Sequence, residues 1–388
     1  MTEPLVTRMR AFGTTIFAEM SALAVQTGSI NLGQGFPDTD GPAAMLDRAV
    51  QAIGAGANQY PPGPGVLELR QAVSEHRAAH YGLSYDPVGE ILVTVGATEA
   101  VAATVLALCE PGDEVIAFEP YYDSYAASIA LAQARLVPVT LRPDQGRFTF
   151  DPAELRAAVT PRTRAVLVNS PHNPTGTVFT REELTAIAEL CQEHGLIAIT
   201  DEVYEHLTFD GVEHIPMATL PGMRERTVMI SSAGKTFSVT GWKTGWVCAP
   251  PELVTAVQTV KQFLTFTANA PWQLAVAYGL RHELEWVAAL RAGLQDKRDR
   301  LMEGLSAAGF SVLRSAGTYF VQTDIRPLGF SDGLELSRRL PELAGVVAIP
   351  TQVFYDHQER GRHFVRFAFC KKDEVIDEAV TRLKRLSS

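Results

Sequence analysis

ILVTVGATEAVAATVLALCEPG, residues 91–112, is the stretch that predicts the class of fold. Its first five residues (91–95) are apolar or β-branched, which is typical of a buried strand. Small and apolar residues then recur at helical spacing from Ala97 to Leu108, and Pro111 with Gly112 ends the helix. A strand joined to a helix by a short turn is the building unit of α/β proteins.

Five more β-branched runs follow, and helical patterns separate several of them. The expected strands begin with EVIAF (from 114), RLVPV (from 135), RAVLVN (from 164), LIAIT (from 196) and TVMISS (from 227). The helices between them have readable starts: Asp151 with Pro152 suits N-cap and N1, and Thr180 with Glu183 forms a capping box. This order predicts a mostly parallel central sheet between layers of helices.

The pattern changes after about residue 275. One long, charged, amphipathic stretch runs to roughly Arg300, and shorter strands are expected near Tyr319 and Phe364. The first ~35 residues contain too little apolar surface for a core of their own. The sequence therefore predicts an N-terminal arm (1–35) that packs with a small C-terminal α/β domain (276–388), and a large domain (36–275) between them.

The composition excludes several classes of protein. The chain has 388 residues, of which 46% are hydrophobic and 20% charged, as in an ordinary globular protein of two domains. A net charge of −10 argues against nucleic acid as a partner, because nucleic-acid binders need clustered Lys and Arg. We find no signal-peptide pattern and no run of ~18 apolar residues, so we expect a cytoplasmic protein without membrane contact. The four cysteines are widely spaced, which favours buried free thiols and no metal site.

Lys235 lies in SSAGKTFSVTGWKTGW (231–246), directly after a predicted strand and among small residues. Ligands gather at the carboxyl ends of strands in open α/β sheets, and small neighbours allow close approach. A nucleotide-binding Walker A loop would need glycine five positions before Gly234, where Met229 stands. A solvated surface lysine remains the simpler interpretation of this segment when it is taken alone.

Two other strand ends carry polar residues that suit a ring-shaped cofactor. Asp201 ends the strand LIAIT, and an unpaired carboxylate there would be costly to desolvate, although it could also be a helix N-cap. Tyr204 follows three residues later, and Asn173 lies between two prolines in SPHNPTG (170–176). Both side chains could donate to an anionic oxygen, while a plain surface turn is the alternative for the SPHNPTG segment.

The turn VGATEA (95–100) ends a strand and opens a helix, an arrangement that binds phosphate through backbone amides. We choose Ala97 and Thr98 as the amide donors, with a hydroxyl from Ser232 and a charge from Lys243. Many α/β loops look like this turn, so the pattern is weak on its own.

An aromatic residue and an arginine complete the set of candidates. Tyr122 in EPYYDSY (119–125) could cover one face of a planar ligand, or pack in an ordinary core. Arg366 lies among apolar residues in HFVRFAFCKKDE (363–374), and a buried arginine must be paired. A carboxylate of a bound ligand and an internal salt bridge are both open as its partner.

Taken together, the motifs resemble the class I/II, fold-type I, pyridoxal-phosphate aminotransferases. Eight segments occur in the family's order and cover nearly the whole chain: LGQGFPD (32–38), NQYPPGPG (58–65), GATEA (96–100), EPYYDSY (119–125), SPHNPTG (170–176), TDEVYEHL (200–207), SSAGKTFSVTGWKTGW (231–246) and HFVRFAFCK (363–371). Order and spacing of so many segments are far more specific than any one of them.

The resemblance implies a role for each candidate. Lys235 would carry pyridoxal 5'-phosphate as a Schiff base and move protons, with Asp201 paired to the ring nitrogen and Tyr122 over the ring. The other implied cofactor ligands are Asn173 and Tyr204 at the phenolate oxygen, and Ala97, Thr98, Ser232 and Lys243 at the phosphate. Tyr60 would reach the phosphate of a partner subunit, which implies a homodimer with shared active sites.

For the substrate, the resemblance implies that Arg366 binds the α-carboxylate with help from Asn173 and Gly35, and that Phe17 covers the side chain. The similar branch includes kynurenine, glutamine and methionine aminotransferases, so we expect an L-amino acid of this kind as donor and a 2-oxo acid such as 2-oxoglutarate as acceptor. FLTFTANAPW (263–272) has Thr267 where some relatives have histidine, and it contains no arginine, which speaks against a dedicated aspartate aminotransferase. An N-succinyldiaminopimelate aminotransferase and a cysteine-S-conjugate β-lyase are the alternatives.

Overall fold

The computed structural model describes residues 4–13 and 15–386 and is built around a seven-stranded sheet in the order β2-β10-β9-β8-β7-β3-β4. β10 pairs antiparallel with both of its neighbours, and the other pairings are parallel. The strands are β2 (Ile91–Thr94), β3 (Glu114–Glu119), β4 (Arg135–Thr140), β7 (Thr163–Asn169), β8 (Ile197–Asp201), β9 (Thr227–Ser232) and β10 (Gly245–Cys248). The predicted α/β class with a mostly parallel central sheet is confirmed.

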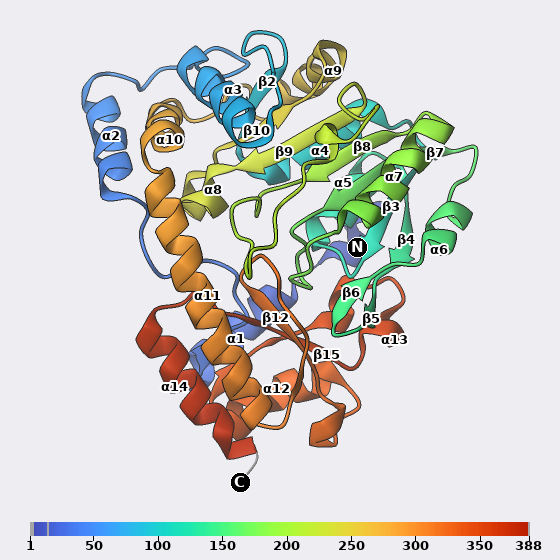
Figure 1. Ribbon diagram of the computed structural model, residues 1–388, viewed down its shortest axis with the longest axis vertical. Helices are drawn as coiled ribbons and strands as arrows, with labels where there is room; N and C mark the ends of the chain where they lie inside the picture. The colour runs from blue at the N-terminus through green and yellow to red at the C-terminus, as the bar shows by residue number, and fades with distance from the viewer. Residues whose placement is uncertain (1–3, 14, 387–388) are drawn as a thin grey trace.

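Helices cover both faces of this sheet (Figure 1). One face packs on α4 (Gly96–Leu108), α5 (Asp123–Leu131) and α9 (Pro251–Lys261). The other face is covered by α7 (Arg181–His194) and, towards β2, by α2 (Ala43–Gly54), α3 (Leu67–Tyr81) and α10 (Ala270–His282). Because both faces are buried, the strands are apolar on both sides, as their sequences indicated.

The helix starts that the sequence predicted are confirmed. Asp151 accepts a hydrogen bond from the amide of Ala153 at 2.8 Å and begins α6 (Pro152–Ala157). Thr180 and Glu183 form a reciprocal capping box at the start of α7, with distances of 3.2 Å and 2.8 Å. Each cap satisfies amides that the first turn of a helix leaves without partners.

A second, smaller sheet lies at the other end of the molecule, in the order β11-β12-β15-β14 (Figure 1). Its strands are β11 (Ser311–Val312), β12 (Phe320–Asp324), β14 (Ile349–Pro350) and β15 (Phe364–Ala368). Its helices are α11 (Leu284–Ala307), α12 (Gly333–Ala344), α13 (Gln358–Gly361) and α14 (Asp373–Leu383). The N-terminal helix α1 (Ile16–Thr27) packs against α12, and β1 (Ile30–Asn31) pairs with β13 (Val346–Val347) of the same region.

One expectation about the helices was wrong. The amphipathic stretch from about 275 to Arg300 is not a single helix, because α10 ends at His282 and α11 begins at Leu284. α10 packs on α2 and α3 while α11 packs on α14, and Glu283 between them has φ −114° and ψ 19°, outside the helical range. Glu283 gives no proline or glycine signal for this break. The predicted boundary at 275/276 falls inside α10, and the domain boundaries stay a prediction.

The remaining α-helix and strands are short, α8 (Ala233–Thr236) and the hairpin of β5 (Arg142–Asp144) and β6 (Arg147–Thr149), and short 3-10 helices lie between the larger elements. Among the described residues, every helix is too short or too polar to cross a membrane. All four cysteines are buried and free, as expected.

Candidate active site

A cavity of about 350 Å³ opens at the carboxyl ends of β8, β9 and β2, between the two sheets. This volume is within the range of small-molecule sites in proteins. Of the site residues expected from the sequence, the structure brings all but Tyr60 into its lining: Phe17, Gly35, Ala97, Thr98, Tyr122, Asn173, Asp201, Tyr204, Ser232, Lys235, Lys243 and Arg366. This placement brings the side chains together, and their roles stay predictions.

Lys235 lies in α8, one turn beyond the end of β9. Its small neighbour Gly234 lies close to the chain that follows, since a Cβ atom there would be 3.1 Å from the Cα atom of Thr240, a tight contact. Burial lowers the pKa of the Lys235 amine to about 8. An amine in this range is available both as a neutral nucleophile and as a base near neutral pH.

Asp201 is buried at the end of β8 and faces the same cavity. One carboxyl oxygen accepts from the hydroxyl of Tyr125 at 2.6 Å, and the other accepts from the amide of Val203 at 3.2 Å. Burial raises the pKa of Asp201, and the hydrogen bond from Tyr125 opposes that rise. In the part of the chain that the structure describes, this carboxyl group has no cation within ion-pair distance, so it can take a cationic ligand group.

The turn before α4 forms a small cradle. Gly96 has φ +74°, and a Cβ atom there would lie 3.0 Å from Nζ of Lys243. Lys243 also reaches Oγ1 of Thr98 at 3.5 Å. The first-turn amides of α4 and this ammonium group therefore lie beside one another, which suits an anion.

Arg366 lies on β15 and is buried, yet it forms no ion pair with any acidic group among residues 4–13 and 15–386. Its two Nη atoms donate to Oδ1 of Asn173 at 3.0 Å and to the carbonyl of Gly33 at 2.9 Å, while Nε has no partner. The ring of Phe320 lies 3.9 Å from its guanidinium carbon. Burial lowers the pKa of Arg366 to about 10. The internal salt bridge considered as an alternative is absent from the described residues.

The aromatic candidates differ in their positions. Tyr122 is the N-cap residue of α5 and lines the cavity, and Tyr204 lies with its ring 5.2 Å from that of Tyr319. Tyr60 is 80% exposed and contacts Phe266, with ring centroids 5.2 Å apart. Within this chain it lies outside the cavity, so its expected role towards a partner subunit stays a prediction.

The residues of the site that sequence reasoning missed include Gln34, Tyr125, Tyr319 and Phe320. Tyr125 was within reach, because it stands in EPYYDSY three residues after Tyr122 and shares a helix face with it. The side-chain amide of Gln34 donates to Oγ of Ser21 at 2.6 Å and ties α1 to the cavity. Tyr319 and Phe320 come from the smaller sheet, and their sequence carries no signal of where that sheet docks.

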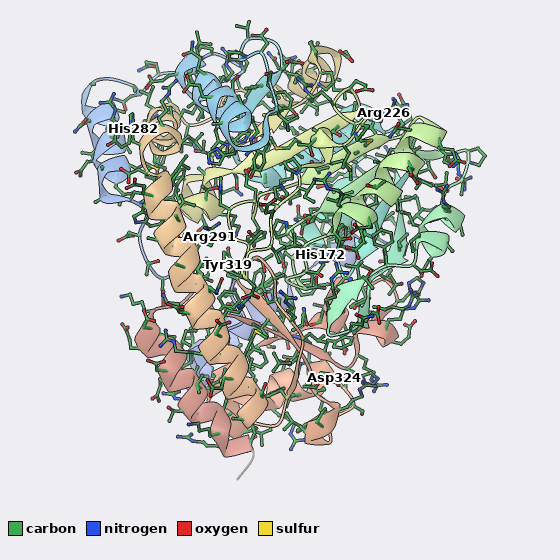
Figure 2. The ribbon with its side chains drawn as sticks, viewed as in Figure 1. His172, Arg226, His282, Arg291, Tyr319 and Asp324 are labelled. Atoms are coloured by element: carbon green, nitrogen blue, oxygen red, sulfur yellow. The ribbon has the colours of Figure 1, made fainter. Side chains whose placement is uncertain are left out.

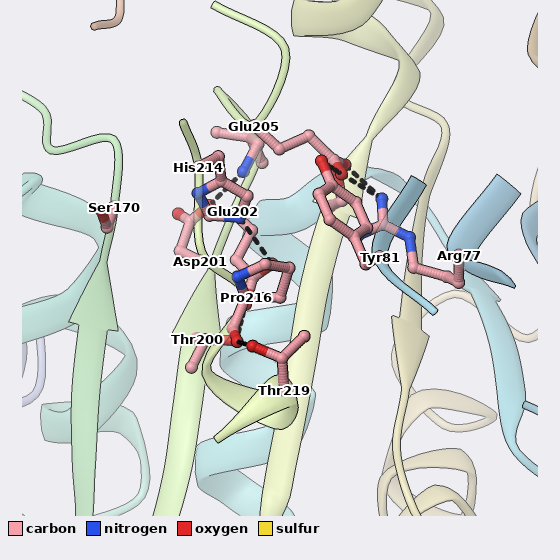
Figure 3. A network of polar contacts seen from close by, with 12 residues as sticks. Arg77, Tyr81, Ser170, Thr200, Asp201, Glu202, Glu205, His214, Pro216 and Thr219 are labelled. Carbon is pink, nitrogen blue, oxygen red and sulfur yellow. Dashed lines mark hydrogen bonds and ion pairs between the residues drawn. The ribbon is translucent and has the colours of Figure 1, made fainter. Parts of the chain in front are cut away.

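A buried polar network lies next to the site (Figure 3). The carboxylate of Glu205 binds Arg77 and also accepts from Tyr81 at 2.8 Å and Ser231 at 2.6 Å. Glu205 adjoins Tyr204 in the chain and Ser231 adjoins Ser232, so the network holds two segments of the cavity wall.

The same network includes a group with the spacing of a metal site. The ligand atoms of His76, Glu205 and His206 lie within 4.8 Å of one another, and the two Nε2 atoms of the histidines are 3.0 Å apart. Both oxygens of Glu205 are already engaged by Arg77, Tyr81 and Ser231. One histidine Nε2 can donate to the other, whereas the buried Nδ1 of His76 has no partner among the described residues.

Comparison with known proteins extends these observations. A family model described as aminotransferase class I and II matches residues 27–383. A probable N-succinyldiaminopimelate aminotransferase of Mycobacterium tuberculosis is 54% identical over 98% of both chains, and the methionine aminotransferase of Escherichia coli is 40% identical over 99% of both. The solved structure of the mycobacterial enzyme superposes with a TM-score of 0.97 at 55% identity, covering 98% of this chain and 100% of that one. A mutant aspartate aminotransferase of Thermus thermophilus gives 0.91 at 33% identity, with coverage of 99% and 100%.

The seven-stranded sheet, the cavity at its carboxyl edge and the second sheet that closes this cavity define a fold-type I transferase. The family model and the relatives match nearly the whole chain, and they identify the family within this class. The chain belongs to the class I and II aminotransferase family, and it is a transaminase. The resemblance drawn from the eight sequence segments is thereby confirmed.

Proposed function

We propose that this aminotransferase works with pyridoxal 5'-phosphate bound to Lys235. One observation carries the proposal: one cavity is lined by a lysine amine, a buried carboxyl group without a cationic partner and a buried arginine without an acidic partner, as far as the described residues show. Burying charged groups that lack a partner lowers the stability of the folded state, so we infer that ligands supply the partners. A cofactor that brings an aldehyde and a cationic ring nitrogen, together with a substrate that brings a carboxylate, would satisfy all three.

The residues present fit each part of this cofactor. Asp201 would keep the ring nitrogen protonated, and Tyr125 would hold that carboxylate in place. Ala97, Thr98, Ser232 and Lys243 would bind the phosphate. Asn173 and Tyr204 would donate to the phenolate oxygen, and Tyr122 would cover the ring. When bound, the cofactor serves as an electron sink for the charge that develops at the substrate Cα.

The chain's own groups would perform the remaining work. Arg366 would bind the α-carboxylate in two-point fashion, with its orientation fixed by Asn173 and its aromatic surroundings excluding water. The amine of Lys235 would take the Cα proton, which its lowered pKa makes possible near neutral pH. Phe17, whose ring lies 5.3 Å from the Arg366 guanidinium carbon, would cover the substrate side chain.

For the substrates, we propose an L-amino acid donor of the glutamine, methionine, aromatic or kynurenine-like kind and a 2-oxo acid acceptor such as 2-oxoglutarate. A second candidate is amino transfer on N-succinyldiaminopimelate, which the 54% identity to the mycobacterial protein favours. The described cavity lining has Arg366 as its sole arginine. A distal carboxylate would therefore need a cation from elsewhere.

We also propose a homodimer with shared active sites. Tyr60, Phe263 and Phe266 are 80%, 84% and 55% exposed, which is unusual for aromatic side chains. A second copy of the chain would cover them and would bring Tyr60 to the phosphate of the neighbouring site. Location in the cytoplasm stays a prediction.

A half-reaction screen tests the proposed function. The cofactor-loaded protein is mixed with single amino acids, including N-succinyldiaminopimelate, and the loss of the resting cofactor absorbance is followed. We expect rapid loss with at least one donor and recovery on addition of 2-oxoglutarate. If every amino acid leaves the spectrum unchanged, the proposal is wrong, and release of pyruvate and ammonia without an acceptor would identify a β-lyase instead.

A further inference from the structure

Tyr319 holds the amine of Lys235 on the side away from the main cavity. Nζ of Lys235 donates to the phenol oxygen of Tyr319 at 2.7 Å, and the hydroxyl of Tyr319 donates to the carbonyl oxygen of Gly35 at 2.6 Å. Tyr319 stands immediately before β12, close to where the two sheets meet (Figure 2). Three segments that are distant in the sequence therefore meet at the phenol oxygen of Tyr319.

The direction of these hydrogen bonds is fixed by proton counting. A tyrosine hydroxyl has one proton, and the Gly35 carbonyl at 2.6 Å takes it because a carbonyl cannot donate, although the Tyr204 hydroxyl is a further hydrogen-bond neighbour of this phenol. Towards Lys235 the phenol oxygen can therefore only accept. A neutral amine has two N–H groups and one lone pair, so donating one N–H to Tyr319 leaves the lone pair unoccupied.

The surroundings support a defined resting place for this amine. Lys235 lines the main cavity and also a second cavity of about 20 Å³, which Tyr319 lines together with Cys370. A space of that size holds about one water molecule. Tyr319 itself is 1% exposed and packs edge-on against Tyr204 and Phe320, so its hydroxyl has little freedom to move.

We propose that Tyr319 is a positioning residue that receives the Lys235 amine whenever this amine is not bonded to the cofactor, and turns its lone pair towards the main cavity. The inference rests on the proposed role of Lys235 and adds to it. In the proton transfer the Cα–H bond breaks, its electron pair stays with the substrate, and an N–H bond forms at Nζ. The resulting ammonium donates to Tyr319 through a charge-assisted hydrogen bond.

The first test measures the amine itself in cofactor-free protein. Lys235 is methylated with formaldehyde and a borohydride reductant at a series of pH values, and its peptide is quantified by mass spectrometry. In Tyr319→Phe we expect the midpoint of reactivity to fall by about 0.5 to 1 pH unit, because the ammonium loses a stronger hydrogen bond than the neutral amine does. Tyr278→Phe, which removes a hydroxyl outside both cavities, is the matched control and should not shift the midpoint.

The second test measures the proton transfer in cofactor-loaded protein. A single-turnover half-reaction is followed with a good donor and with the same donor deuterated at Cα. We expect Tyr319→Phe to slow this step by about 10- to 100-fold, the usual scale for a misdirected catalytic group, while the dissociation constant of the donor stays within about twofold. The deuterium isotope effect should be at least as large as in the unchanged protein.

Two results would overturn the inference: an unchanged midpoint with a rate within about twofold, or a defect confined to donor binding. If Tyr319→Phe does not fold, 3-fluorotyrosine at position 319 keeps the ring and weakens the acceptor, so a smaller downward shift is expected. Failure of the proposed function can be told apart from failure of this inference. In the first case the protein without substitutions would bind no cofactor at Lys235. If the protein without substitutions binds the cofactor and reacts as expected, and Tyr319→Phe behaves in the same way in both tests, only the role of Tyr319 is refuted.

Discussion

Arg366 is a buried guanidinium whose polar partners are an amide oxygen and a backbone carbonyl, and its Nε has no partner among the described residues. Neither partner carries the negative charge that would offset its burial. Asp201 shows the opposite imbalance, a buried carboxyl group held by neutral donors. Two buried groups of opposite charge, each without a counterion among the described residues, support the proposal that ligands bring the missing charges.

The first prediction concerns Arg366→Lys. A lysine cannot form the planar two-point contact, so we expect KM for the amino acid to rise by about 100-fold, with a much smaller change in kcat. Steady-state kinetics measure both, and Arg291→Lys, an exposed position without such contacts, is the control. If KM stays within about threefold, Arg366 is not the carboxylate ligand.

The second prediction concerns Asp201→Asn, which keeps the shape and removes the charge. We expect the rate of the half-reaction to fall by more than about 100-fold, because a neutral amide cannot keep the ring nitrogen protonated. Cofactor should still bind through Lys235 and the phosphate cradle, though more weakly. Stopped-flow absorbance gives the rate, and a variant as fast as the unchanged protein would contradict the assignment.

At the scale of elements, α3 and the segment after β8 are joined by the buried pair of Arg77 and Glu205 (Figure 3). The Arg77 guanidinium holds the pKa of Glu205 well below its usual range, although burial acts the other way. Such a pair adds little net stability, yet leaving either partner alone is costly. We infer that the main role of this ion pair is to fix the position of the neighbouring residue Tyr204.

The third prediction follows from this pair. Glu205→Gln leaves the Arg77 charge uncompensated and should lower the free energy of unfolding by about 3–5 kcal/mol in urea denaturation. Glu303→Gln, on an exposed face of α11, should change it by less than about 0.5 kcal/mol. Combining Glu205→Gln with Arg77→Met should lose less than the sum of the single changes, and simple additivity would refute the coupling.

At the scale of the whole molecule, much of the fold could be predicted because each strand and helix carries its own local pattern. The placement of Ala97, Thr98, Ser232, Lys235 and Lys243 at one cavity was predictable for a similar reason: they stand at or near points where one predicted element ends and the next begins. Tyr319 and Phe320 could not be predicted, because the docking of the smaller sheet places them. The break at Glu283 was missed likewise, since it depends on where α10 and α11 pack.

The fourth prediction is a dependence of stability on pH. Burial lowers the pKa of His172 to about 3 and of His206 to about 4, below the value of about 6.5 in the unfolded chain. As the pH falls below about 6.5, these two histidines bind protons in the unfolded state but stay neutral in the folded state. Stability that is fully present above pH 6.5 is therefore lost progressively towards pH 4, at about 1.4 kcal/mol per pH unit for each histidine.

Urea unfolding at pH 7.5 and pH 5 checks this behaviour. His172→Gln should flatten the slope of stability against pH by about one proton, whereas His282→Gln, at an exposed position, should leave it unchanged. An unchanged slope in the His172 variant would show that this imidazole is not held neutral.

The central claim is that Lys235, and no other amine, bonds the cofactor. Borohydride reduction of the loaded protein makes that bond permanent, and digestion followed by mass spectrometry locates the added phosphopyridoxyl group. We predict one modified lysine per chain, at Lys235, and its complete absence in Lys235→Ala. Modification at Lys243 or at several lysines, or an unmodified Lys235, would contradict the account.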